Sequence, residues 1–108
     1  MKLNLILVAV CCLTASLSAP AFAQNAGADT FKATKCAMCH GADGLGTTSM
    51  GKAMKAASFK NPALVNAPDS QLINSIKNGK NNKMPAYGSK LTDNQIKAVV
   101  VYIRSLQK

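Results

Sequence analysis

The chain has 108 residues, which is enough for one domain and too few for two. Thirteen Lys and Arg residues against four Asp and Glu give a formal net charge of +9, and such an excess favours binding to an acidic partner. The lysines are scattered singly rather than clustered, which argues against a protein that binds nucleic acid. No Trp, three Phe and two Tyr are present, so we expect a bound apolar group to complete the small core.

The first 23 residues have the pattern of a secretory signal peptide. Lys2 precedes an apolar run over residues 3–17, and Ala21-Phe22-Ala23 is a small-residue cleavage site before Gln24. The run is short for a membrane-spanning helix, so a retained anchor is the weaker alternative. We therefore predict a cleaved signal peptide over 1–23, a mature domain over 24–108, and a periplasmic or otherwise extracytoplasmic protein without a stable membrane anchor.

The mature chain predicts an all-α fold, because no strand pattern of period two appears in it. Residues 24–28 are expected to be a short flexible lead. The next elements, in chain order, are a helix from Asp29 or Thr30 into Cys36, a glycine-rich loop over 41–46, a weak helix over 50–57 and a break at 60–62.

Two later helices have clearer end signals. Pro68 and Asp69 open the first of them, and Gly79 ends it, as a glycine just past a helix commonly does. Thr92 and Gln95 form a capping box for the last helix. Apolar residues then recur at helical spacing to the end of the chain, which predicts one buried face.

The five residues from Cys36 to His40, CAMCH, match the attachment motif for c-type haem. Two thiols at this spacing on a helical turn can bond to the two vinyl groups on one edge of the porphyrin. His40 then lies beneath the iron as a ligand, and its second ring nitrogen needs a hydrogen-bond acceptor. We expect a backbone carbonyl in the loop after Gly46 to accept that bond. A zinc site would need further Cys or His ligands, which residues 24–108 lack.

Met84 is the candidate for the second axial ligand of the iron. It lies in the irregular segment 80–90 and is followed by Pro85, so a stiffened loop can reach the opposite face of the haem. Pairing of Met with His favours reduced iron and suits electron transfer. Met50 and Met54 have helical spacing, and we expect them to pack in the core.

Three segments together resemble the class I c-type cytochromes of bacteria. They are the attachment motif with Gly41 after it, the run Lys83-Met84-Pro85-Ala86-Tyr87, and the last helix from Leu91 to Leu106. The resemblance spans residues 29–106 and implies a cytochrome c fold, with three to five helices wrapped around one covalent haem c and its iron.

The resemblance also implies contacts for particular side chains. Phe31 and Tyr102 would meet where the first and last helices cross, and Pro85 and Tyr87 would lie in the haem pocket. The family often has a proline about a dozen residues after the ligand histidine, but Lys52 stands at that position here.

The sequence predicts a one-electron carrier and not an enzyme, because His40 is the only His and no acid–base pair is visible near it. Lys35 and Lys83 flank the two ligand segments and are expected to face an acidic docking patch on a redox partner, such as a terminal oxidase or reductase. Two alternatives stay open. One is an open-site haem protein, a peroxidase or small-ligand sensor, in which Met84 leaves the iron free. The other is a docked electron-transfer subunit of a larger redox complex.

Overall fold

The computed structural model describes residues 18–108, with side chains from Phe22 onward. In this part the chain forms six helices and no strand, apart from one isolated bridge between Lys80 and Met84. The helices are α1 (Ser18–Ala33), α2 (Ala37–His40), α3 (Ser49–Met54), α4 (Pro62–Val65), α5 (Asp69–Asn78) and α6 (Asp93–Leu106). The all-α prediction is confirmed, and the number exceeds five because α2 and α4 are single turns of four residues. Most of the predicted signal peptide lies outside the described residues.

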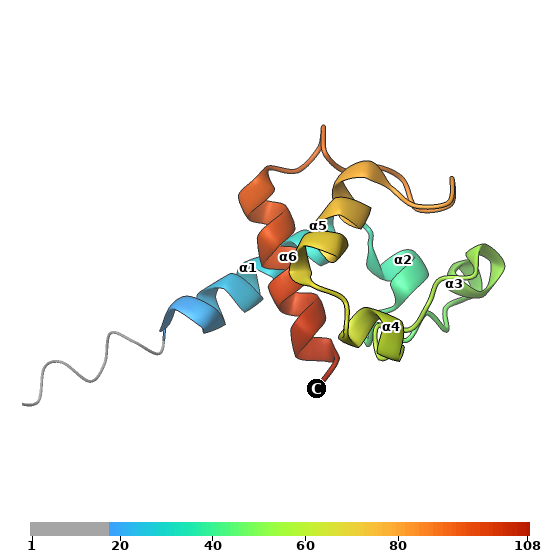
Figure 1. Cartoon of the computed structure of the whole chain (residues 1–108), viewed down its shortest axis with the longest axis horizontal. Helices are drawn as coiled ribbons and strands as arrows, with labels where there is room; N and C mark the ends of the chain where they lie inside the picture. Colours follow the sequence, from blue (N-terminus) through green and yellow to red (C-terminus); the bar gives the residue numbers. More distant parts are fainter. Residues whose placement is uncertain (1–17) are drawn as a thin grey trace, which may run out of the picture.

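Helices α1 and α6 cross and pack against each other (Figure 1). A Cβ at Gly27 would lie 2.0 Å from the Ala98 carbonyl oxygen, so only glycine permits this close approach of the two backbones. One turn later Phe31 meets Tyr102 edge to face, with ring centroids 5.2 Å apart. The implied contact between the first and last helices is therefore confirmed.

The beginning of α1 differs from the sequence prediction. Residues 24–28 are helical rather than a flexible lead, and Asp29 lies inside the helix instead of capping it. Alanine-rich sequence supplies the helix propensity, and the contact of Gly27 with α6 adds tertiary stabilisation at that point. The helix also ends at Ala33 and does not continue into Cys36 as predicted.

The short helices of the middle segment have capped first turns. Thr48 caps α3, which confirms the weak helix signal there, and Lys55 ends it at a φ of 57°. The predicted break at 60–62 also starts a helix, because the Asn61 side chain accepts a hydrogen bond from the Ala63 amide at the start of α4.

The boundaries of α5 and α6 agree with their sequence signals. Pro68 precedes α5 and Gly79 follows it at a φ of 78°. At α6 the Gln95 amide donates to the Thr92 hydroxyl (3.1 Å), and the Thr92 amide donates to Gln95 Oε1 (2.8 Å), which is the predicted capping box.

The core lies between α6, α5 and the second half of α1. Its buried side chains come from segments far apart in the sequence, so the long-range packing of α6 organises the domain. They are Phe31, Phe59, Ala67, Leu72, Ile76, Leu91, Ile96, Val99, Val100 and Ile103. Within the described part of the chain, none of the helices has both the length and the apolar character needed to cross a membrane.

Candidate functional site

A cavity of about 500 Å³ opens between the attachment turn and the segment after α5. This volume lies within the range of small-molecule and cofactor sites. Core side chains from several helices form its apolar wall. All six residues predicted for the site line it, namely Cys36, Cys39, His40, Met84, Pro85 and Tyr87. The structure therefore brings together two thiols, an imidazole and a thioether from segments about 40 residues apart.

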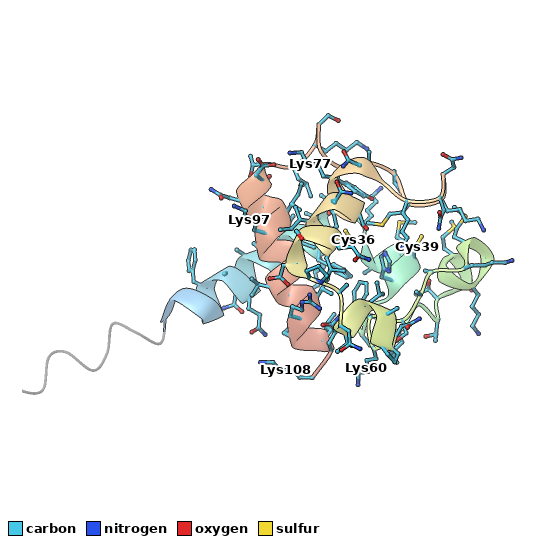
Figure 2. The ribbon with its side chains drawn as sticks, in the orientation of Figure 1. Cys36, Cys39, Lys60, Lys77, Lys97 and Lys108 are labelled. Carbon is cyan, nitrogen blue, oxygen red and sulfur yellow. The ribbon has the colours of Figure 1, made fainter. Side chains whose placement is uncertain are left out.

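The attachment turn follows a sharp change of chain direction at Lys35, which has a φ of 63°. Cys36, the N-cap of α2, and Cys39 within α2 then line the same cavity, and Figure 2 labels both. Both are unpaired thiols. Burial raises the pKa of the Cys36 thiol, so the protonated form is favoured there. The Thr34 hydroxyl lies 3.3 Å from the Cys36 sulfur and is its one hydrogen-bonding neighbour among the described side chains.

Thr48 and Gly51 hold the attachment turn from outside the cavity. The Thr48 hydroxyl donates to the Met38 carbonyl (2.6 Å) and accepts from the Gly51 amide (2.9 Å). A Cβ at Gly51 would lie 2.1 Å from the Cys39 carbonyl oxygen, so α3 can pack on α2 only with glycine at this position. The sequence prediction missed both residues. The available signal was a threonine, a common N-cap residue, followed by a short helical turn that contains a glycine.

The His40 ring stacks on Phe59, with centroids 4.8 Å apart and an angle of 29° between the planes. Its Nδ1 atom is buried and has no hydrogen-bond partner within residues 18–108. The predicted acceptor in the loop after Gly46 is therefore wrong. The Gly46 amide instead donates to the main-chain carbonyl of His40 (2.8 Å), which fixes the backbone and not the ring. Burial lowers the pKa of His40 and favours the neutral imidazole.

The segment that carries Met84 is a tight turn closed by its own backbone. Lys80 and Met84 exchange two amide-to-carbonyl hydrogen bonds of 3.1 Å each. Asn81 and Asn82 lie between them with φ values of 55° and 57°, a left-handed conformation that asparagine tolerates better than most residues. Further on, the Tyr87 amide donates to the Ile76 carbonyl (2.9 Å) and fastens the turn to α5.

Gly79 allows this turn to fold back on the end of α5. Its φ is 78°, and a Cβ there would lie 2.7 Å from the Met84 carbonyl oxygen. The glycine was predicted as a helix terminator, but its closeness to the candidate ligand was not. That contact depends on the fold of the following turn, which the sequence pattern does not specify.

The other two methionines of the middle segment do not lie in the core. Met50 is 47% exposed, so the expectation for it is wrong, and Met54 is half-buried against the cavity. The reason is the position of α3, which packs on α2 at the edge of the molecule and away from α6 (Figure 1).

Lysines surround the cavity opening. Lys35, Lys55, Lys80 and Lys83 are exposed and line it, whereas no Asp or Glu is among the described lining residues. Two of the four acids form ion pairs elsewhere, Asp69 with Arg104 (2.9 Å) and Asp93 with Lys77 (3.2 Å). Further lysines lie around the outer edge of the molecule, and Figure 2 labels Lys60, Lys77, Lys97 and Lys108.

The donor set and the cavity fit a covalently attached haem better than a bare metal ion. No three His, Cys, Asp or Glu side chains in the described part are grouped closely enough to hold an ion. Two thiols beside an apolar space suit thioether bonds to a flat macrocycle, and imidazole and thioether groups suit its iron. A buried Nδ1 leaves Nε2 as the ring nitrogen available for coordination.

The family model described as cytochrome c oxidase, cbb3-type, subunit III matches residues 22–103. The chain is also 34% identical over 103 residues to cytochrome c6 of a Synechococcus species, which covers 94% of this chain and 88% of that protein. Among solved structures, the KustC0563 c-type cytochrome superposes with a TM-score of 0.68 at 29% identity, covering 76% of this chain and 98% of that one.

Oxidase subunits form a second group of relatives. The chain is 33% identical over 84 residues to the cbb3-type cytochrome c oxidase subunit FixP of Azorhizobium caulinodans, which covers 78% of this chain and 27% of FixP. It is 38% identical over 73 residues to subunit CcoP of Rubrivivax gelatinosus, which covers 68% of this chain and 23% of CcoP. The chain thus spans about a quarter of the length of these two relatives.

Proposed function

Since the chain belongs to the class I c-type cytochromes, electron carriers with one covalent haem c, we propose that Cys36 and Cys39 bind the haem and that His40 and Met84 hold its iron. The observation that carries the proposal is that one cavity is lined by all four side chains. The resemblance seen in the sequence is thus a family membership, and the haem and the electron-carrier role follow from it. The assignment of individual ligands is our proposal.

Each of these residues has a defined task in the proposed site. The haem supplies reversible one-electron oxidation and reduction of its iron. The Cys36 and Cys39 thiols would form thioether bonds to the vinyl groups, and His40 would offer a neutral nitrogen donor. Met84 would offer a soft sulfur donor, which favours the ferrous state and raises the reduction potential. The apolar wall and the Met84 turn would exclude water from the iron.

A spectrum of the oxidised protein tests the ligation. We expect a far-red methionine–iron charge-transfer band that disappears in Met84→Ala. Met54→Ala is the matched control, because Met54 also lines the cavity, and it should keep the band. A high-spin oxidised spectrum in the unmutated protein would contradict the proposal and favour an open-site peroxidase or ligand sensor.

The described lining residues support a carrier rather than an enzyme. They include no carboxylate, and His40, their one imidazole, is assigned to the iron. A haem peroxidase needs a general acid or base beside an open coordination position, and the described lining offers no carboxylate and no second imidazole for that role. Turnover of hydrogen peroxide at an enzymatic rate by the unmutated protein would refute this part of the proposal.

The partner we propose is a redox protein with an acidic docking patch. Four exposed lysines without a carboxylate among them ring the cavity opening, and the Lys83 and Lys35 side chains are the two next to the ligand segments. Such a field speeds association at low salt. Electron-transfer rates to an acidic acceptor should fall at low salt in Lys83→Glu, and fall much less in Lys97→Glu, an exposed position on α6. Equal rate losses in both variants would argue against a defined docking face.

We further propose export with cleavage before Gln24. Cleavage there would keep the Gly27 contact with α6, because this residue lies beyond the cut. N-terminal sequencing of the native protein should begin at Gln24. The size of the native material at low and high salt distinguishes a free carrier from a docked subunit, because only a docked subunit should be found in a larger complex. The names of FixP and CcoP describe those relatives as oxidase subunits.

A further inference from the structure

Within the described residues, the His40 ring lacks the hydrogen bond at Nδ1 that usually fixes the orientation of a ligand histidine. Histidines that bind metals in proteins almost always donate their other ring N–H to a carbonyl, carboxylate or water, which fixes the plane of the ring. Here Nδ1 is buried and has no partner in the described part of the chain. The ring instead lies 4.8 Å from the Phe59 ring at an angle of 29°. Among the residues that the structure describes, an aromatic stack is therefore the one directional contact of the imidazole.

Phe59 is itself held from three sides. Its amide donates to the Gly44 carbonyl (2.8 Å), and a Cβ at Gly44 would lie 2.4 Å from the ring. The Gln107 side chain donates to the Phe59 carbonyl (3.0 Å) from the last turn before the C-terminus. The Phe31 ring meets Phe59 edge to face, with centroids 6.2 Å apart. A ring fixed in this way presents a stationary flat surface to the imidazole.

We propose that Phe59 is the positioning residue for His40, and that its ring, in place of a hydrogen bond at Nδ1, sets the plane of the imidazole at the iron. This inference rests on the proposed ligation by His40. An imidazole without an acceptor at Nδ1 is less basic than one that donates a hydrogen bond. Such a ligand stabilises ferric iron less, so the missing acceptor at Nδ1 favours a high reduction potential.

The experiment compares Phe59→Leu with Leu72→Ala in the full haem-loaded chain. Both residues are buried and both line the cavity, but only Phe59 stacks on His40. Paramagnetic proton NMR of the oxidised protein reports the orientation of the ligand plane through the spread of the haem methyl shifts. We expect this spread to change in Phe59→Leu and to stay near the unmutated pattern in Leu72→Ala, although both variants lose stability. The same change in both variants would overturn the proposal.

Measurements on the unmutated, reduced protein keep the proposal testable if Phe59→Leu does not fold. Nuclear Overhauser contacts between the ring protons of His40 and Phe59 are expected, together with an Nδ1 proton that has no carbonyl acceptor. An Nδ1 proton bonded to a carbonyl, or no contact between the rings, would overturn it. The far-red band on the same samples separates the two proposals. If the far-red band is present and the two variants have identical NMR patterns, only the role of Phe59 is refuted. If the band is absent from the unmutated protein, ligation by Met84 is refuted.

Discussion

The two segments that face each other across the cavity are built differently. The attachment side, residues 34–51, has side-chain hydrogen bonds in addition to its main-chain hydrogen bonds, such as the Thr48 hydroxyl on the Met38 carbonyl, and Gly51 packs closely against Cys39. The ligand loop, residues 79–88, is held almost entirely by main-chain hydrogen bonds within itself and to α5. Its Met84 side chain is half-buried and its neighbours Lys83 and Pro85 are exposed.

This difference separates two kinds of failure. Loss of an attachment thiol should weaken the binding of the haem, which completes the core, and smaller changes on the attachment side should lower the stability of the fold without changing the iron ligands. Damage to the ligand loop should change the coordination of iron while the haem stays attached and the helices stay packed. Segments with few buried contacts open at lower free energy than the rest of a domain, so the loop is the side from which the iron site would open first.

Loss of either attachment thiol is expected to have the largest effect. Cys36→Ala or Cys39→Ala removes one thioether bond to a group whose binding free energy contributes to folding. We expect less haem incorporated per chain, and a weakened or lost cooperative thermal transition. Met38→Ala is the control, because Met38 lies between the two cysteines and is 53% exposed. A cysteine variant that folds normally without haem would contradict this expectation.

Gly79→Ala should break the ligand loop while leaving the attachment side intact. A non-glycine residue at this φ of 78° costs about 1–3 kcal/mol, and the new Cβ would also press on the Met84 carbonyl. The far-red band should weaken and the haem should stay covalently bound. Absorption spectra and denaturant unfolding of the oxidised protein measure the two effects.

Gly41→Ala is the matched variant on the attachment side, since its φ of 80° gives a similar backbone cost. It should lower the free energy of unfolding by a similar amount and keep the methionine band. If both variants lost the band equally, the separation between the two sides would be wrong.

The parts of this molecule that could be predicted from sequence are those determined by neighbouring residues. The CAMCH motif, the capping box at Thr92 and the glycine after α5 depend on spacings of a few positions, so a single sequence contains the whole signal. Met84 could be proposed as a ligand because it lies in an irregular segment stiffened by Pro85, which can reach the opposite face of the haem from the attachment motif.

The parts that could not be predicted depend on contacts between distant segments. Phe59 is one aromatic residue in an irregular stretch, and its stack on His40 exists only after the chain has folded back on itself. Gly27 was predicted to lie in a flexible lead. The contact that requires glycine there is with the Ala98 carbonyl, which lies 71 residues further along the chain. The predicted hydrogen-bond acceptor for His40 Nδ1 was wrong for the same reason. It came from the general rule that a ligand histidine donates to an acceptor, because the sequence does not show which residues lie beside this atom.

Thr48→Ala should have a smaller effect than Gly79→Ala on the iron site and a measurable effect on stability. The change removes the N-cap of α3, worth about 1 kcal/mol, and the hydrogen bond to the Met38 carbonyl, worth about 1 kcal/mol more. The free energy of unfolding should therefore fall by about 2 kcal/mol. Thr48→Ser keeps the hydroxyl and should recover most of the loss in denaturant unfolding.

Thr92→Ala is expected to have the smallest effect, and it sets the scale for Thr48. Thr92 also caps a helix through its hydroxyl, but that hydroxyl only accepts, from the Gln95 amide, and donates to no acceptor among the described residues. Its loss should cost about 1 kcal/mol, because α6 is long and its buried face still packs against α1. Unfolding curves of the two alanine variants should differ by about the free energy of one hydrogen bond, with the absorption spectrum of Thr92→Ala unchanged. Equal losses in the two variants would mean that the Met38 contact contributes nothing to holding the attachment turn.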